Sequence, residues 1–94
     1  MKIILAPRAR KQLANQMRYL VDQHAHDAAR KFERTISNFL KGTVALYPAS
    51  GTYLTHRELW ERAVPQSHFV VWYRFTREEI EVVRVWHSSQ NRYS

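Results

Sequence analysis

The chain has 94 residues and a net charge of +7, with fifteen lysines and arginines against eight acidic residues. Its 45% hydrophobic content argues against disorder, and its length suits one domain, 1–94, with a modest core. No apolar run approaches the roughly 20 residues that cross a bilayer, residues 1–5 are too short for a signal peptide, and no cysteine is available for a disulfide or a thiolate metal site. We therefore expect a cytoplasmic protein. The charge favours an anionic partner, for which nucleic acid, an acidic protein segment and an anionic membrane surface all qualify.

The first half of the chain predicts a strand and two helices. Residues 2–6 form a short apolar run typical of a strand, and Pro7 follows where its fixed φ suits a first helical turn. Apolar residues then recur at helical spacing as far as about His24, which predicts an amphipathic helix. Asp27 is the predicted cap of a second amphipathic helix and Gly42 its predicted stop. Two such helices usually pack as an antiparallel hairpin.

The second half predicts a loop and three strands. A proline and a glycine interrupt residues 46–55, which predicts a loop, and a strand is expected from Arg57 to Ala63. Two β-rich runs between Phe69 and His87, around a four-residue polar connection, predict a hairpin. The order predicts an α+β fold in which the helical pair covers one face of a four-stranded antiparallel sheet, and the first strand also joins that sheet.

Short motifs along the whole chain resemble one known family. They are Pro7, Ala9, Leu13, Tyr19 and Leu20 in the first helix, Ala28, Ala29, Phe32 and Ile36 in the second, Leu46, Pro48 and Gly51 in the loop, and Arg57-Glu58-Leu59, Tyr73-Arg74 and Ile80 to His87 with Gln90 in the last strands. In this order and spacing they are similar to the RelE/ParE superfamily of type II toxin–antitoxin systems. The resemblance implies a strand–helix–helix–three-strand (β-α-α-β-β-β) toxin domain, in agreement with the pattern of the residues.

The resemblance also implies a function, and the superfamily divides by target. ParE-like members poison DNA gyrase without known catalytic residues, RelE-like members cut messenger RNA on the ribosome, and an antitoxin neutralises both. The Arg-Glu-Leu, Tyr-Arg and Val-Arg-Val-Trp-His segments resemble the ParE-like branch. We therefore expect a ParE-like inhibitor of DNA gyrase, with no cofactor and no membrane partner, that forms a hetero-oligomer with an acidic antitoxin.

Two other functions stay open. One is a RelE-like, ribosome-dependent mRNA endoribonuclease, and the other is a basic binding module that has lost its toxicity and keeps only its affinity for the antitoxin. Cleavage through the 2′-hydroxyl of RNA needs a base, cations for the phosphate and an acid. The candidates for these roles are Arg57, Arg74, Arg84, His87 and Tyr93.

Candidate binding residues follow from the charge pattern and the resemblance. The expected target-binding residues are Arg57, Arg62, Arg74, Arg84, His87 and Arg92. Positive charge on the helical hairpin places the antitoxin contact near Arg10, Lys11, Arg18 and Arg30, and onto the sheet. The five histidines show no metal-ligand spacing, so no metal site is predicted.

Strand geometry limits how these residues combine. Strict alternation places Arg84 with Trp86 on one face and His87 with Val83 and Val85 on the other, unless a bulge or the strand end intervenes. His87 is then either a proton-exchanging group or a strand-end residue bonded to a neighbour.

The arginines and the tryptophans of the predicted strands can each have one of two roles. Arg74 and Arg84 either contact phosphate or form ion pairs with one of three glutamates, namely Glu58, Glu61 and Glu81. The three tryptophans either form a stacking platform or fill the core. We expect core positions for at least two of Trp60, Trp72 and Trp86.

Overall fold

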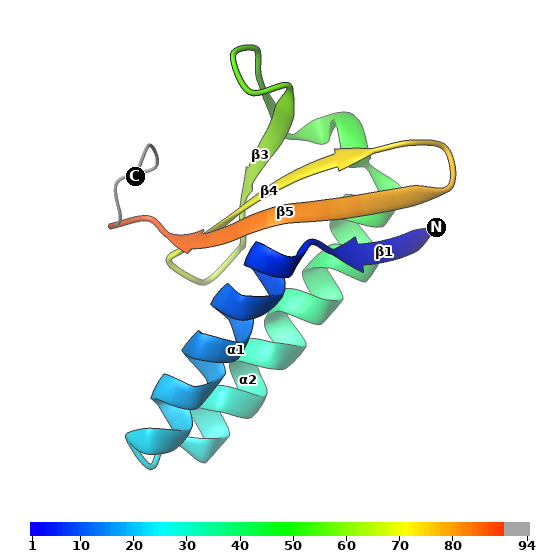
Figure 1. Cartoon of the computed structure of the whole chain (residues 1–94). Helices are drawn as coiled ribbons and strands as arrows, with labels where there is room; N and C mark the ends of the chain where they lie inside the picture. Colours follow the sequence, from blue (N-terminus) through cyan, green and yellow to red (C-terminus); the bar gives the residue numbers. More distant parts are fainter. Residues whose placement is uncertain (90–94) are drawn as a thin grey trace.

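A computed structural model of the chain describes residues 1–89, and in it five strands form one sheet in the order β1-β5-β4-β3-β2 (Figure 1). The strands are β1 (Lys2–Leu5), β2 (Thr52–Leu54), β3 (Leu59–Ala63), β4 (Phe69–Phe75) and β5 (Glu79–His87). The pairs β2–β3, β3–β4 and β4–β5 are antiparallel, as predicted for the second half of the chain.

The first strand joins the sheet, but with the opposite polarity to the expected one. β1 pairs in parallel with β5, with Ile3 opposite Ile80 and Leu5 opposite Val82. The helical hairpin and the other strands lie between these two strands in the chain, and a crossover of this length permits parallel pairing. The α+β fold class is confirmed. The expectation of four strands, all antiparallel, is wrong.

Two helices cover one face of the sheet and project beyond it (Figure 1). They are α1 (Pro7–Asp22) and α2 (His26–Asn38), and neither is long and apolar enough to cross a membrane. Their inner faces pack on alternate residues of β4 and β5. The buried cluster between the two layers consists of Ala9, Ile36, Phe39, Leu40, Val44, Val64, Val71, Tyr73, Ile80, Val82 and Val85.

The turn between the helices needs no glycine. His24 adopts a left-handed backbone (φ 58°) after α1, and the N–H of Ala25 donates to the carbonyl of Leu20 at 2.9 Å. This is a Schellman termination with histidine in the position that glycine usually takes. α2 then begins at His26, so Asp27 lies in its first turn and forms an ion pair with Arg30. The predicted capping role of Asp27 is wrong, because the helix starts one residue before it.

Gly42 does not end the helical segment. The chain continues as a π-helix, η1 (Phe39–Val44), that passes through the glycine. Phe39, Leu40 and Val44 are buried in the core, and we infer that their packing outweighs the low helix propensity of glycine. The predicted stop is therefore wrong for a tertiary reason.

The predicted loop contains a short 3₁₀ turn, η2 (Pro48–Ser50), and the edge strand β2. Tyr73, fully buried in β4, donates its hydroxyl to the carbonyl of Pro48 at 2.5 Å and so ties this segment to the sheet. Gly51 lies at the same place, and a Cβ there would come within 2.7 Å of the carbonyl oxygen of Glu61. The predicted loop therefore contains regular structure. β3 begins at Leu59, two residues later than expected, because Glu58 adopts a left-handed backbone (φ 53°).

Replacing the two glycines by alanine should have opposite effects. At Gly51 the added methyl group collides with the β3 backbone, so Gly51→Ala should lower the free energy of unfolding by about 1–3 kcal/mol. At Gly42 a Cβ meets nothing within 4 Å, so Gly42→Ala should raise it by up to about 1 kcal/mol. Urea unfolding of both variants measures the difference. Equal stability of the two variants would contradict the close approach at Gly51.

Tyr73 should make stability depend on alkaline pH. Burial raises the pKa of the Tyr73 phenol above its ordinary value. The unfolded chain releases this proton near pH ~10 while the folded chain keeps it, so the free energy of unfolding should fall as the pH rises beyond that value. Tyr73→Phe should show a shallower fall, and at neutral pH it should be less stable by about 1 kcal/mol through loss of the bond to Pro48. Urea unfolding across this pH range tests both effects, and parallel pH profiles would contradict the first.

Candidate functional site

A bulge in β5 decides which of its side chains share a face. Trp72 of β4 pairs with Arg84, and the next residue, Tyr73, pairs with Val82, so Val83 is the extra residue. Val83 consequently packs with the tryptophans on the face of the sheet opposite the helices, here termed the far face. The predicted grouping of Val83 with Val85 is wrong. Because the bulge precedes Arg84, it does not bring Arg84 to the face of His87.

Two arginines and two tryptophans gather on the far face. Trp72 and Trp86 are 3% and 6% exposed, and their ring centroids lie 5.8 Å apart. The guanidinium carbon of Arg84, itself 6% exposed, lies 5.4 Å from the Trp72 ring and 5.8 Å from the Trp86 ring. Arg57 is exposed and lies 4.9 Å from the Trp72 ring. These four residues are termed the arginine–tryptophan cluster.

Among residues 1–89, the carboxylate of Glu61 and the cation of Arg8 also act on this cluster. Glu61 accepts a hydrogen bond from Nε1 of Trp72 at 2.7 Å. The pKa of Arg84 is lowered, first by burial, then by the charge of Arg8 and then by that of Arg57. Like charges therefore converge here, and the buried cation is held by aromatic faces, which attract guanidinium groups.

Sequence reasoning missed Arg8 as a member of this site. Arg8 lies in the first turn of α1, and the N–H of Ala6 just before it donates to the carbonyl of Val82 at 2.8 Å. That bond fixes the start of the helix beside the bulge. A signal existed in the sequence, since Pro7 marks the first turn, but only the parallel pairing of β1 with β5 places that turn near Arg84.

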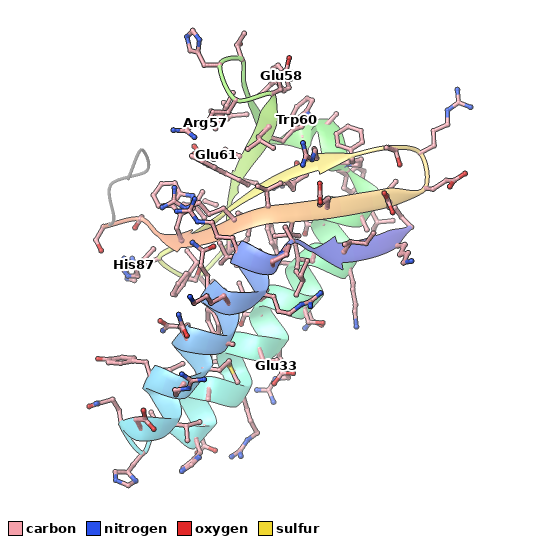
Figure 2. The ribbon with its side chains drawn as sticks, in the orientation of Figure 1. Glu33, Arg57, Glu58, Trp60, Glu61 and His87 are labelled. Carbon is pink, nitrogen blue, oxygen red and sulfur yellow. The ribbon has the colours of Figure 1, made fainter. Side chains whose placement is uncertain are left out.

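His87 lies on the other side of the sheet. Its Nδ1 is 2.7 Å from the Ser89 hydroxyl, and its ring packs edge-on to Phe69 at 5.3 Å. Figure 2 shows His87 and Arg57 on opposite sides of β5. The interpretation of His87 as a strand-end residue bonded to a neighbour is confirmed, and so is its predicted separation from Arg84.

The remaining predicted target-binding residues are dispersed. Arg62 lies on the helix side, with its guanidinium carbon 5.8 Å from the Phe39 ring. Arg74 forms an ion pair with Glu81, with 2.5 Å between Nε and Oε1, so one of the predicted cross-strand pairs is present. Arg92 and Tyr93, like Gln90, lie outside the described residues.

The tryptophan prediction holds. Trp72 and Trp86 are buried in the far-face cluster, so at least two of the three fill apolar layers. Trp60 is half-buried on the helix side, where its ring contacts Tyr53 at 5.2 Å and Phe75 at 5.7 Å. None of the three is an exposed stacking platform.

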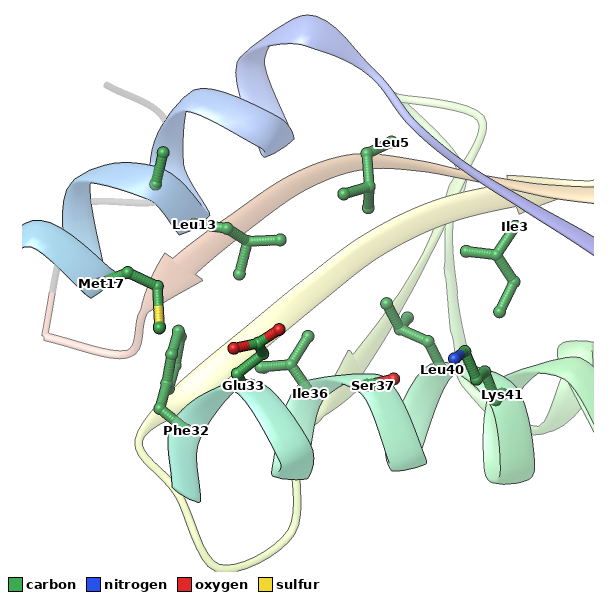
Figure 3. Close-up of a pocket in the computed structure, with 11 residues that line it drawn as sticks. Ile3, Leu5, Leu13, Met17, Phe32, Glu33, Ile36, Ser37, Leu40 and Lys41 are labelled. Atoms are coloured by element: carbon green, nitrogen blue, oxygen red, sulfur yellow. The ribbon is translucent and has the colours of Figure 1, made fainter. Parts of the chain in front are cut away.

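An apolar groove of about 480 Å³ runs between β1, α1 and α2 (Figure 3). Its apolar lining includes Ile3, Leu5, Leu13, Met17, Phe32 and Ile36. Glu33 and Lys41 are the charged residues at its edge. The predicted antitoxin-binding residues Arg10, Lys11, Arg18 and Arg30 are all exposed on the same two helices, outside the lining of the groove. No group of three or more histidine, aspartate or glutamate residues within 1–89 is arranged to hold a metal ion.

Comparison with solved structures shows that this architecture occurs elsewhere. A solved structure described as the chromosomal ParDE TA system from P. aeruginosa superposes with a TM-score of 0.75, at 16% sequence identity over 93% of this chain and 95% of that chain. At this identity the match establishes the fold. No curated protein sequence matches the chain.

A family model supplies the finer assignment. The model described as the ParE toxin of the type II toxin-antitoxin system, parDE, matches residues 3–92. The chain therefore belongs to the ParE toxin family. The predicted membership of the RelE/ParE superfamily and the ParE-like placement within it are confirmed.

Proposed function

We propose that this ParE-family toxin inhibits DNA gyrase in the bacterial cytoplasm and is neutralised by an acidic antitoxin. The observation that carries the proposal is the match of the ParE toxin model to residues 3–92. The ParDE system that shares the fold is a toxin–antitoxin pair, which supports a hetero-oligomer with an antitoxin here as well.

The geometry of the site supports inhibition by binding rather than by RNA cleavage. A ribonuclease needs a proton-transferring group within reach of the cations that hold the phosphate. Arg57 and Arg84 share the Trp72 ring on the far face, whereas His87 lies on the helix side and is engaged with Ser89. Of the proposed ribonuclease residues within 1–89, the base and the cations are therefore on opposite faces.

The groove supports the antitoxin part of the proposal. An amphipathic helix can bury its apolar stripe between β1 and the helical hairpin, where the groove has an apolar floor. Acidic residues beside that stripe would then meet the exposed cations of α1 and α2, including Arg10, Lys11, Arg18 and Arg30. The proposed antitoxin contact therefore combines burial of an apolar stripe in the groove with the predicted charge complementarity on the helices.

Plasmid supercoiling by purified gyrase tests the proposed target. The wild-type toxin should inhibit supercoiling. His87→Ala should inhibit equally well, because the His87 ring bonds to Ser89 and lies on the face of the sheet opposite the arginine–tryptophan cluster. In a bacterial cell-free translation reaction, the same toxin should leave the messenger RNA intact.

Two results would contradict the gyrase proposal. Cleavage of translated messenger RNA that disappears in His87→Ala would establish the ribonuclease alternative. Growth without arrest in cells that express the toxin alone, together with tight antitoxin binding, would establish the binding module that has lost its toxicity.

A pair of neighbouring substitutions tests the groove. Ala14 is an exposed residue of α1 that lines the groove, whereas Asn15 is exposed and does not. Ala14→Glu should weaken binding of the antitoxin encoded beside the toxin gene by about tenfold or more, roughly 1.4 kcal/mol, because it places bulk and negative charge on the apolar floor. Asn15→Glu introduces the same negative charge outside the groove, so this variant should bind the antitoxin much more tightly than Ala14→Glu does. Calorimetric titration measures both, and equal losses would exclude the groove as the contact.

A further inference from the structure

We propose that Glu33 and Lys41, at the edge of the apolar groove, select the antitoxin helix by the charges beside its apolar stripe. The helix that fits carries a lysine or arginine opposite Glu33 and an aspartate or glutamate opposite Lys41, about seven or eight residues apart. The proposal deepens the function proposed above, because it rests on an amphipathic antitoxin helix as the occupant of the groove.

The first argument is the position of the two charges. Glu33, Ser37 and Lys41 follow one another at intervals of four residues and form the polar edge of the groove along α2 and η1. Figure 3 shows Glu33 beside Phe32 and Lys41 beside Leu40, at opposite ends of this edge. Eight residues of helix span roughly 12 Å, so a second helix laid along the groove meets both charges within about two of its own turns.

The second argument is that both charges are available to a partner. Glu33 and Lys41 are exposed, and neither has an ion pair or a side-chain hydrogen bond with another residue of the range 1–89. The other acidic residue of α2, Asp27, pairs with Arg30 on the same helix. The charge of Asp27 is therefore compensated within the toxin, whereas the charge of Glu33 is left for a partner.

The third argument is the cost of covering the groove. A helix that buries its apolar stripe there removes water from the edge of the groove as well. A charge that loses water without gaining a partner raises the free energy of the complex. A cation opposite Glu33 and an anion opposite Lys41 avoid this cost, and apolar or like-charged residues do not. The groove therefore favours one pattern of charges over other amphipathic helices.

The pairing at Glu33 has a sign that distinguishes it from general attraction. The chain carries a net charge of +7, so an acidic antitoxin is attracted to it, and replacing an acidic residue of the toxin by lysine should strengthen that long-range attraction. At Glu33 the proposed contact predicts the opposite result, because the substitution there places two cations against each other.

Calorimetric titration with the antitoxin encoded beside the toxin gene tests the pairing. Glu33→Lys should weaken binding by about a hundredfold and Glu33→Gln by about tenfold, because an attractive contact becomes repulsive or neutral. Glu78→Lys is the matched control, since Glu78 is exposed in the turn between β4 and β5 and does not line the groove. This control should bind as tightly as wild type or more tightly. Thermal unfolding verifies that each variant is folded.

An exchange of charges across the interface tests the contact directly. Each lysine or arginine beside the apolar stripe of the antitoxin helix is changed in turn to glutamate. One of these antitoxin variants should bind the Glu33→Lys toxin more tightly than it binds the wild-type toxin. A lysine in place of the acidic residue about two turns away should likewise restore binding of the Lys41→Glu toxin.

Three results would overturn the proposal. The first is equal affinity of Glu33→Lys and Glu78→Lys for the antitoxin. The second is that no charge exchange in the antitoxin restores binding of Glu33→Lys. The third is an antitoxin helix with no lysine or arginine beside its apolar stripe.

Two further measurements keep this proposal apart from the proposed function. If Ala14→Glu weakens antitoxin binding and Glu33→Lys does not, the groove stands as the contact and the charge pairing is refuted. If the wild-type toxin leaves gyrase active while Glu33→Lys loses antitoxin binding as expected, the gyrase target is refuted and the charge pairing stands.

Discussion

The pairing of β4 with β5 is the constraint on which the rest of the structure depends. Its register places Tyr73 and Val82 toward the helices and Trp72 and Arg84 away from them, with Val83 as the additional residue between the two registers. If Val83 were paired regularly and the bulge were absent, strict alternation after Val82 would place Arg84 on the helix-facing side and Val85 on the far face. A single bulge thus separates an apolar layer from a cationic one.

This separation gives the molecule two surfaces of different chemistry. On the helix side, β1, α1 and α2 leave an apolar groove whose occupant gains mainly from burial of hydrocarbon surface. On the far side, guanidinium groups lie against indole rings, and their charge dominates that surface. The two surfaces lie on opposite faces of the sheet.

The cationic layer illustrates how a buried arginine is retained in a small protein. Burial and two neighbouring cations lower the pKa of Arg84, so its charged form is held at a cost in stability. The rings of Trp72 and Trp86 offset part of that cost, and the hydrogen bond from Trp72 to Glu61 fixes the orientation of one ring.

Apolar periodicity and turn residues were sufficient to predict the helical hairpin, the β4–β5 hairpin and the α+β class, because these features depend on neighbours in the chain. The same local signals misplaced the end of the second helix at Gly42, where burial of Phe39, Leu40 and Val44 carries the helix onward. The candidate site was predicted in part. Arg57 and Arg84 were named from charge and resemblance, whereas Arg8 entered only through the parallel pairing of β1 with β5. By itself the sequence determined the elements, the excess of positive charge and the family. The tertiary structure alone decided which charges meet, because a one-residue bulge and a long crossover set the faces and neighbours of side chains far apart in the chain.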